Sequence, residues 1–378
     1  MLINEIPDDC LLAIFEYLNS LEDLINCYKV CVKWSNLITK RTKKTKYLID
    51  QRGYSSDVVY YPRPCLIDST CLSELFTNLK IVELSSELHY KVEDAIEFVR
   101  KQESLKGLIN FLDKPIEKYC YKLEMLSVSN FKPHKLRISS SMKQLNVWDY
   151  SLRALTRDAR YLPNLERLKI TIIGPDNRYD GPVLGKLKML EMAFRRHDEI
   201  FYGFQLMDLC PNLQSAHIYM STNSWFFDET LKHKCLQDLV IEFIIEFDGS
   251  DNGNHTWNNL KRLLMKYPNL KHLSFKYLRD LKDEHIQQLV RILPNLVLLD
   301  ARECQEVTQR AADYIQDFCK RYGRSIKFYF NGNRDEILSD RPELSLERAV
   351  ISRGFDFMKN CFFEEHIFLS LFLIPIDF

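Results

Sequence analysis

Two stripes of apolar positions at helical spacing mark the first forty residues. The first stripe occupies positions i, i+3, i+4 and i+7, which hold Leu11, Ile14, Phe15 and Leu18. Pro7 suits a first helical turn, and Asp8 and Asp9 place negative charge at the positive end of the helix dipole. The pattern therefore predicts a helix that begins near residue 8 and buries one face.

A second stripe follows at once. Ser20 with Asp23 three residues later is typical of a capping box, in which side chains satisfy the free N–H groups of a helix start. The apolar positions of this stripe are Leu21, Leu24, Cys27, Cys31, Trp34 and Ile38. Their spacing predicts a second helix with a kink. A segment of about 45 residues buries too little surface to fold alone, so we expect it to lean on a partner.

From residue 79 onward the apolar pattern LxxLxL recurs. Its copies begin at Leu79, Leu123, Met142, Leu165, Leu187, Leu213, Leu236, Leu270, Leu296 and Gly323. From Leu123 the copies start 19 to 27 residues apart, except for one interval of 34 residues. Most intervals fall in the range of about 20 to 29 residues that is typical of leucine-rich repeats. A weak copy at 105–108, after a helix-like segment at 92–102, stays open.

Each copy predicts a short strand followed by a loop and a helix, and stacked copies form a solenoid. The tripeptide Pro-Asn-Leu precedes four of the strands, at Pro163, Pro211, Pro268 and Pro294. Proline cannot continue a helix, so it ends one and restarts the repeat. Near the C-terminus, Val307 and Thr308 start a predicted helix and Gly323 follows its end.

The N-terminal motif resembles an F-box. The matching positions are Ile6-Pro7, Ile14-Phe15, Asp23-Leu24, Val30-Cys31 and Trp34. Two positions depart from the family pattern: Ile6 stands where leucine is usual, and Val32 where a basic residue is usual. With the repeats, the chain resembles F-box proteins with leucine-rich repeats. This resemblance implies an α/β fold in which a helical F-box precedes a curved solenoid, with a parallel concave sheet and helices on the convex side.

The resemblance also implies a domain organisation and a function. We expect an F-box over 1–46, a linker over 47–74, about ten irregular leucine-rich repeats over 75–330, and a C-terminal cap or tail over 331–378. F-box proteins bind a Skp-family adaptor that links them to a cullin-RING ubiquitin ligase. The expected function is that of a substrate receptor without catalytic activity of its own. The alternatives are an adaptor-bound scaffold or inhibitor without ligase activity, and an enzyme with a site in a repeat pocket or in 54–77.

Two sets of residues are candidates for binding. The adaptor-binding candidates are Ile6, Pro7, Leu11, Ile14, Phe15, Leu18, Leu24, Cys31 and Trp34. Strand side chains alternate sides, so those between the apolar positions face the concave surface, where mixed charges and aromatic residues suit protein recognition. The target-binding candidates there are Trp148, Arg167, Lys169, His217, Tyr219, His272, Asp300, Arg302 and Tyr329.

The composition of the chain argues against several classes of function. The chain balances 52 basic against 52 acidic residues, which argues against a dedicated nucleic-acid binder. The run 40–46 holds five basic residues and is either a nuclear localisation signal, a nucleic-acid patch or a solvated helix end. Eleven cysteines without a CxxC pair, and histidines without HExxH, indicate neither a disulfide framework nor a metal site. We expect no cofactor, no catalysis, and a cytoplasmic or nuclear location.

Two segments fall outside the repeats. Residues 247–257 form an insertion that accounts for the long interval, and we expect a loop there, possible as a partner contact but without a nucleotide-binding motif. The tail ends in an apolar run at 367–376, which is too short to span a bilayer as a helix and contains Pro375. We expect no membrane contact. The tail is a cap on the last repeat, a segment that returns along the solenoid, or a mispredicted exon; the cap is the preferred interpretation.

Overall fold

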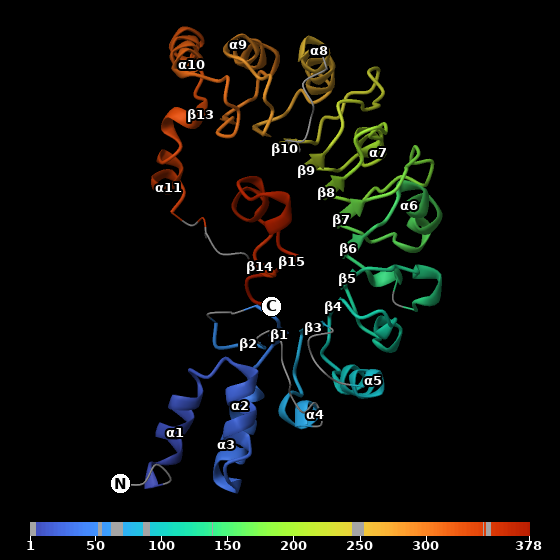
Figure 1. Cartoon of the computed structure of the whole chain (residues 1–378), viewed down its shortest axis with the longest axis vertical. Helices are drawn as coiled ribbons and strands as arrows, with labels where there is room; N and C mark the ends of the chain where they lie inside the picture. The colour runs from blue at the N-terminus through green and yellow to red at the C-terminus, as the bar shows by residue number, and fades with distance from the viewer. Residues whose placement is uncertain are drawn as a thin grey trace. The chain divides into compact units, whose positions relative to one another are not determined.

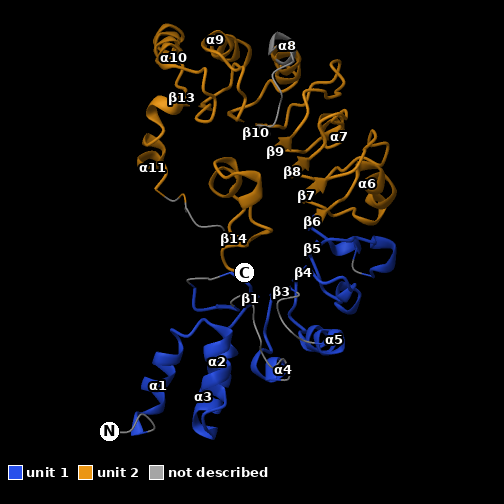
Figure 2. Ribbon diagram, in the orientation of Figure 1, with its two compact units in different colours: residues 1–146 blue, residues 147–378 orange. Residues whose placement is uncertain are grey.

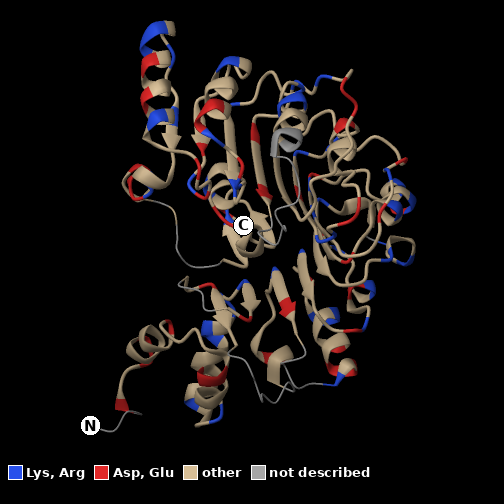
Figure 3. Cartoon of the chain, turned by 45° about the horizontal axis from the view of Figure 1, so that its top comes forward, with Lys and Arg blue, Asp and Glu red and all other residues tan. Residues whose placement is uncertain are grey.

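The computed structural model describes residues 5–51, 55–61, 71–85, 91–137, 139–243, 253–342, 344 and 349–378. The chain divides into two compact units, residues 1–146 and residues 147–378, which Figure 2 shows in separate colours. The fold class is the expected one: α/β, with N-terminal helices followed by parallel strands that alternate with helices (Figure 1). Charged residues of both signs are interspersed along the helices of each unit (Figure 3).

Three helices open the first unit: α1 (Asp8–Phe15), α2 (Leu21–Tyr28) and α3 (Val32–Thr42). The Ser20 hydroxyl accepts a hydrogen bond from the Asp23 N–H at 3.5 Å, as the capping pattern predicts. The predicted second helix is two helices, because the chain leaves helical geometry after α2 and Cys31 is fully extended, with φ −165° and ψ 167°. Trp34 and Ile38 therefore lie on α3, on a different helix from Leu24.

Five parallel strands follow in this unit, in the order β2-β1-β3-β4-β5. They are β1 (Tyr47–Ile49), β2 (Val58–Tyr60), β3 (Ile81–Leu84), β4 (Gly107–Asn110) and β5 (Met125–Val128). The helices α4 (Leu72–Leu75) and α5 (Val92–Lys101) lie between them along the chain, with short 3-10 turns at Ile116–Tyr119, Pro133–Lys135 and Ser139–Ser141. β4 is the repeat copy that the sequence left open.

The segment 47–74 differs from the expected linker. It contains β1 and β2, and all three residues of β1 are buried. The three apolar side chains of β1 are buried, so this segment extends the sheet as strands and is not a solvent-exposed linker. β6 (Gln144–Trp148) contains the position at which the two units divide.

Parallel strands form the sheet of the second unit, in chain order. They are β7 (Arg167–Ile172), β8 (Met189–Phe194), β9 (Ser215–Met220), β10 (Asp238–Phe243), β11 (His272–Lys276), β12 (Leu298–Asp300) and β13 (Lys327–Tyr329). The middle apolar position of each copy is in register from β7 to β12, as Leu168, Leu190, Ala216, Leu239, Leu273 and Leu299. In β13 the third position of the copy that begins at Gly323, Phe328, pairs with Leu299 instead. The LxxLxL spacing therefore matches the register of the sheet as far as β12.

Helices follow the strands along one side of this sheet (Figure 1). They are α6 (Leu152–Asp158), α7 (Gly203–Asp208), α8 (Gly253–Leu264), α9 (Asp283–Ile292) and α10 (Gln309–Tyr322), with a 3-10 turn at Ala159–Tyr161 after α6. The α10 boundaries are those predicted, because the Thr308 hydroxyl caps the start and Gly323 takes a left-handed φ of 63° at the end. Of the insertion at 247–257, residues 247–252 lie outside the described residues and 253–257 begin α8.

The Pro-Asn-Leu tripeptide joins neighbouring repeats. Asn212 donates to the Gly185 carbonyl at 2.6 Å, and Asn295 donates to the Pro268 carbonyl at 3.0 Å. Asn269 makes the same contact with the Lys234 carbonyl at 2.8 Å. Each amide satisfies a main-chain acceptor of the preceding repeat, so the asparagine links one repeat to the next at the turn where proline has ended the helix.

The C-terminal residues return along the open side of the sheet of this unit (Figure 1). After β13 come a 3-10 turn (Asn331–Asn333), α11 (Glu336–Asp340), β14 (Ile351–Arg353), a π-helical turn (Met358–Phe362), a 3-10 turn (His366–Phe368) and β15 (Phe372–Ile374). An apolar cluster joins strand residues to the tail: Val240, Leu298, Tyr329, Ile337, Phe357, Cys361, Phe362, Leu369 and Leu373. The structure thus shows the returning segment and not the preferred cap. All six residues of β7 are buried because both faces of the strand are covered.

Candidate functional site

Exposed apolar side chains lie along α1 and at the α2–α3 junction. Ile14 is 50% exposed, Val30 55% and Val32 78%. The Lys33 ammonium donates to the Ile6 carbonyl at 2.9 Å and lies 3.2 Å from a carboxylate oxygen of Asp8, so the start of α3 is held beside the start of α1. We define the N-terminal apolar surface as the exposed residues Pro7, Cys10, Ile14, Val30 and Val32. Exposed apolar side chains on these helices are candidates for protein binding.

The adaptor-binding candidates divide into two groups. Leu11, Phe15 and Leu24 are buried, and the Phe15 ring packs edge-on against Trp34 with 5.0 Å between ring centroids. Pro7 and Ile14 are exposed, while the partly exposed candidates are Ile6, Leu18, Cys31 and Trp34. The buried three form the interior of the helices, and the others are able to meet a partner; adaptor binding by these nine residues stays a prediction.

Sequence reasoning omitted three residues of this surface from its candidates: Cys10, Val30 and Val32. Val30 lies in the short break between α2 and α3, and Val32 is the first residue of α3; both side chains are exposed. The signal was present in the motif, because Val32 is apolar where the family usually has a basic residue. A continuous helix through residues 21–38 would have turned these positions away from the apolar stripe, so the missed helix break hid them.

The basic run at 40–46 is not a uniform charged patch. Arg41 is only 1% exposed, and its guanidinium donates to the Leu18 carbonyl at 3.3 Å and to the Asn19 side-chain oxygen at 2.9 Å. Burial lowers the pKa of Arg41. Lys44 pairs with Glu16 at the surface. At least two of the five basic groups are therefore engaged within the N-terminal helices, which weakens the interpretation of this run as a nucleic-acid patch.

A row of charged side chains crosses the sheet of the second unit beneath the C-terminal tail. The row, called the strand face here, consists of Arg167 and Lys169 on β7, Glu191 on β8, His217 on β9, Glu242 on β10 and Lys276 on β11, all at most 5% exposed. The Arg167 guanidinium donates to both carboxylate oxygens of Glu191, at 2.8 and 3.0 Å. Two-point pairs of this kind are among the strongest hydrogen-bonded contacts in proteins.

The strand face holds the tail by its main chain. Arg167 donates to the Ser370 carbonyl at 2.7 Å and to the Leu371 carbonyl at 3.3 Å, and Lys169 donates to the Leu369 carbonyl at 2.9 Å. Lys276 donates to the carbonyl of Glu364. In the opposite sense, the His366 N–H donates to a carboxylate oxygen of Glu242 at 3.0 Å. The polar contacts thus recognise peptide groups of the tail, and side chains of the tail fill the apolar cluster.

Two histidines lie at the centre of the strand face. His217 places one ring nitrogen 3.2 Å from the Cys361 carbonyl and the other 3.1 Å from Glu242. His366 stacks on Tyr219 with 5.5 Å between ring centroids and meets His217 edge-on at 5.7 Å. The buried Nε2 atom of His366 has no hydrogen-bond partner among the described residues. A proton on this nitrogen would have no acceptor nearby.

Burial and neighbouring charges set the ionisation of this site. Burial lowers the pKa of His366 well below 6.5, and the positive charges of Lys169, His217, Arg195 and Lys276 lower it further. Burial also lowers the pKa of His217, although the bond to Glu242 opposes this. For Glu191, burial acts to raise the pKa, but Arg167 and Lys169 outweigh it and hold the pKa below its usual range. The site is built around a neutral His366 beside ionised carboxylates.

Most target-binding candidates lie beneath the tail. The buried ones are Arg167, Lys169, His217, Asp300 and Tyr329; the partly exposed ones are Tyr219, His272 and Arg302, and Trp148 is 36% exposed. A target could touch the buried five only if the tail moved away. Target binding by these residues stays a prediction. The tail residues that cover them were missed, because the segment 331–378 carries no repeat pattern that places it in space.

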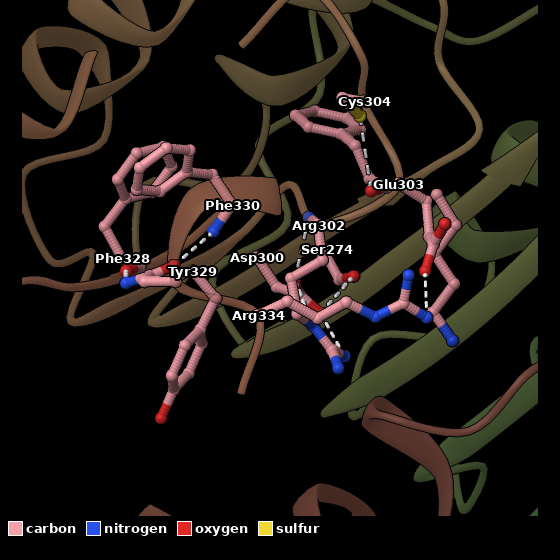
Figure 4. A network of polar contacts seen from close by, with 12 residues as sticks. Ser274, Asp300, Arg302, Glu303, Cys304, Phe328, Tyr329, Phe330 and Arg334 are labelled. Atoms are coloured by element: carbon pink, nitrogen blue, oxygen red, sulfur yellow. Dashed lines mark hydrogen bonds and ion pairs between the residues drawn. The ribbon is translucent and has the colours of Figure 1, made fainter. Parts of the chain in front are cut away.

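Another group of polar contacts lies near the last strands (Figure 4). The Arg302 guanidinium donates to both carboxylate oxygens of Asp300 at 2.9 Å, and the Ser274 hydroxyl donates to Asp300 at 3.3 Å. Arg302 also lies 5.7 Å above the ring of Phe363 in the tail. These candidates therefore neutralise one another, and together they support the tail instead of offering free charges to solvent.

Metal ligands, cysteines and membrane-spanning helices were the remaining features to place within the described ranges. No group of three or more His, Cys, Asp or Glu side chains in the part of the chain that the structure describes is arranged to hold a metal ion. Ten cysteines are described, and each is a free thiol. No helix among the described residues is both long enough and apolar enough to cross a bilayer.

Comparison with known proteins identifies the N-terminal helices. Residues 3–43 match the F-box-like family model, a range that contains α1, α2 and α3. Comparison with curated proteins gave no match. Among solved structures, the chain is similar to one titled "Crystal structure of Rad7 and Elc1 complex in yeast", with 16% sequence identity, 80% of this chain and 90% of that chain covered, and a TM-score of 0.39. The chain therefore carries an F-box-like domain at its N-terminus.

Proposed function

We propose that this chain is the substrate-recognition subunit of a Skp-cullin-F-box E3 ubiquitin ligase. The F-box-like match at residues 3–43 carries the proposal, since F-box domains bind a Skp-family adaptor. In this proposal the strands and helices of residues 75–330 are leucine-rich repeats that bind a target protein. The chain itself performs no chemistry; it raises the local concentration of the target near the ligase. We place this activity in the cytoplasm or the nucleus.

The N-terminal apolar surface supports the adaptor part of this proposal. Its members come from both α1 and the α2–α3 junction, and the contacts of Lys33 with Ile6 and Asp8 hold the starts of α1 and α3 together. Large side chains in the centre of an interface carry most of its binding energy. Ile14 and Val32 are the best candidates for this role, because they are exposed while Leu11 and Phe15 already hold the helices together from inside.

The test is a pull-down of the full-length chain with a purified Skp-family adaptor. Ile14→Glu places a charge on the proposed interface without entering the helix interior, and we expect adaptor affinity to fall at least about tenfold, since burying an unpaired carboxylate costs more than about 1.4 kcal/mol. Tyr121→Glu is the matched control, because Tyr121 is 66% exposed and lies outside the F-box-like range. Full binding by a folded Ile14→Glu variant would reject the assigned surface.

One observation favours the alternative of an adaptor-bound scaffold or inhibitor. The strand face, where the target-binding candidates lie, is filled by the C-terminal tail of the same chain. A receptor whose recognition face is occupied would assemble with adaptor and cullin without delivering a target. Reconstituted ubiquitylation separates the two: the receptor transfers ubiquitin to a co-purified protein, whereas the scaffold assembles the complex and modifies nothing bound to its repeats.

A further inference from the structure

We infer that the strand face is a peptide-binding groove and that residues 361–374 are its intramolecular ligand. The ligand class is a peptide segment that presents its carbonyl groups to basic side chains and its apolar side chains to the sheet. The existence of the groove follows from the second unit alone. Its use by target proteins, which would then compete with the tail for the same face, rests on the proposed function.

The polar contacts show how the groove recognises a peptide. Four carbonyl groups of the tail, at 364, 369, 370 and 371, accept hydrogen bonds from Arg167, Lys169 or Lys276. One tail N–H, that of His366, donates to Glu242. Every peptide chain carries such groups, so these contacts supply affinity for the peptide main chain without reading its sequence.

Side chains of the tail supply the sequence preference. Phe362, Leu369 and Leu373 are at most 1% exposed and belong to the apolar cluster. His366 lies between them in sequence, stacked on Tyr219. Ile367 and Phe368 are 46% and 42% exposed. The groove therefore reads the pattern Phe-x3-His-x2-Leu-x3-Leu and leaves the intervening pair outside.

The tail is not a strand of the sheet on which it lies. β14 and β15 pair only with each other, as a separate two-stranded sheet. The parallel ladder from β7 to β13 is complete without them. Contact with the sheet is instead made by side chains of the strand face and by the apolar cluster, which is how a protein holds a peptide ligand and not how it adds a strand.

The first experiment measures peptide binding in trans. The probe is a fluorescein-labelled synthetic peptide of residues 358–378, added to the full-length chain and followed by fluorescence anisotropy. The variant Leu369→Asp/Leu373→Asp puts two carboxylates into the apolar cluster and should free the groove from its own tail. We expect this variant to bind the peptide at least tenfold more tightly than the unaltered chain, whose groove is occupied.

Matched controls distinguish binding in the groove from non-specific peptide binding. Ile367→Asp/Phe368→Asp changes two exposed residues of the same tail, so its groove should stay occupied and its peptide binding should equal that of the unaltered chain. A peptide that itself carries Leu369→Asp and Leu373→Asp should not bind the freed groove. Adding Lys169→Met and Lys276→Met to the freed chain should weaken binding of the normal peptide at least tenfold.

The inference fails if the freed variant keeps its circular dichroism spectrum yet does not bind the peptide. If that variant does not fold, hydrogen exchange on the unaltered chain decides. Exchange of the His366 amide before the β7–β13 amides supports a separable ligand, and exchange only with global unfolding overturns it. Adaptor pull-down of the same variant reports on the N-terminal helices alone, so failure of this inference and failure of the proposed function are distinguishable.

Discussion

Replacing Arg167 by methionine is the sharpest test of how the second unit is held together. Methionine keeps much of the length and apolar stem of arginine but removes the guanidinium. That group makes two hydrogen bonds to Glu191, at 2.8 and 3.0 Å, and two to tail carbonyls. Glu191 is fully buried, so the substitution leaves a carboxylate without its main partner in a site that water does not reach.

The expected magnitude follows from this geometry. Breaking a buried ion pair by removing one partner costs about 3 to 5 kcal/mol, because the remaining charge is uncompensated. The two tail carbonyls lose charge-assisted donors as well, which puts the expected loss near the upper end of this range. The double variant Arg167→Met/Glu191→Leu should recover most of the loss, since two apolar side chains replace both charges.

Urea unfolding followed by circular dichroism measures these values, provided that one transition reports the second unit. Arg262→Met is the matched control: Arg262 also faces a single carboxylate, Glu229, but both side chains are about half exposed, so the loss should stay below about 1 kcal/mol. A loss for Arg167→Met no larger than that of the control would show that burial and tail contacts do not strengthen the Arg167–Glu191 pair, and the reasoning would be wrong.

Three further predictions test other parts of the structure. Phe15→Ala should destabilise the N-terminal helices by about 3 to 5 kcal/mol in chemical unfolding, because it removes a buried ring that packs on another aromatic, and a loss below 1 kcal/mol would contradict that packing. In thiol labelling of the native chain, Cys10 should react and Cys304 should not, since Cys10 is exposed while burial raises the pKa of Cys304; equal rates would refute this. The pKa of His366 is lowered in the fold, so its stabilising contribution is present above about pH 6.5 and is lost as the pH falls through and below that value; the protection of the tail amides against hydrogen exchange, relative to their intrinsic rates at the same pH, should therefore fall on acidification, and His366→Phe should reduce this pH dependence.

Much of the fold could be predicted because it is periodic. The LxxLxL spacing identifies the strands, and the Pro-Asn-Leu tripeptides mark where a repeat restarts, so the strand order and the position of α10 follow from local patterns. The helix break at Cys31 could not, because apolar spacings of three and four continue through it. A stripe of apolar residues does not distinguish one kinked helix from two helices that meet at a turn.

The candidate site could be predicted only in part. The alternation of strand side chains correctly places Arg167, Lys169 and His217 on the face away from the helices. What lies on that face could not be predicted, because the contacts to Leu369 and Ser370 join residues about 200 positions apart in sequence and run through main-chain carbonyls, which every residue possesses. Charged residues at these positions were compatible with a solvated face and with a buried one.

The charges of the strand face explain why its occupant is a peptide segment with carbonyl groups and not a purely apolar group. Three basic side chains, Arg167, Lys169 and Lys276, share the strand face with two acidic ones, Glu191 and Glu242, so burial would leave an excess of hydrogen-bond donors. Carbonyl groups accept from these donors without adding a full negative charge, and the tail brings four of them to the three basic side chains. An occupant that offered only apolar side chains would leave these donors without acceptors, so any partner that displaces the tail must also present main-chain carbonyl groups to them.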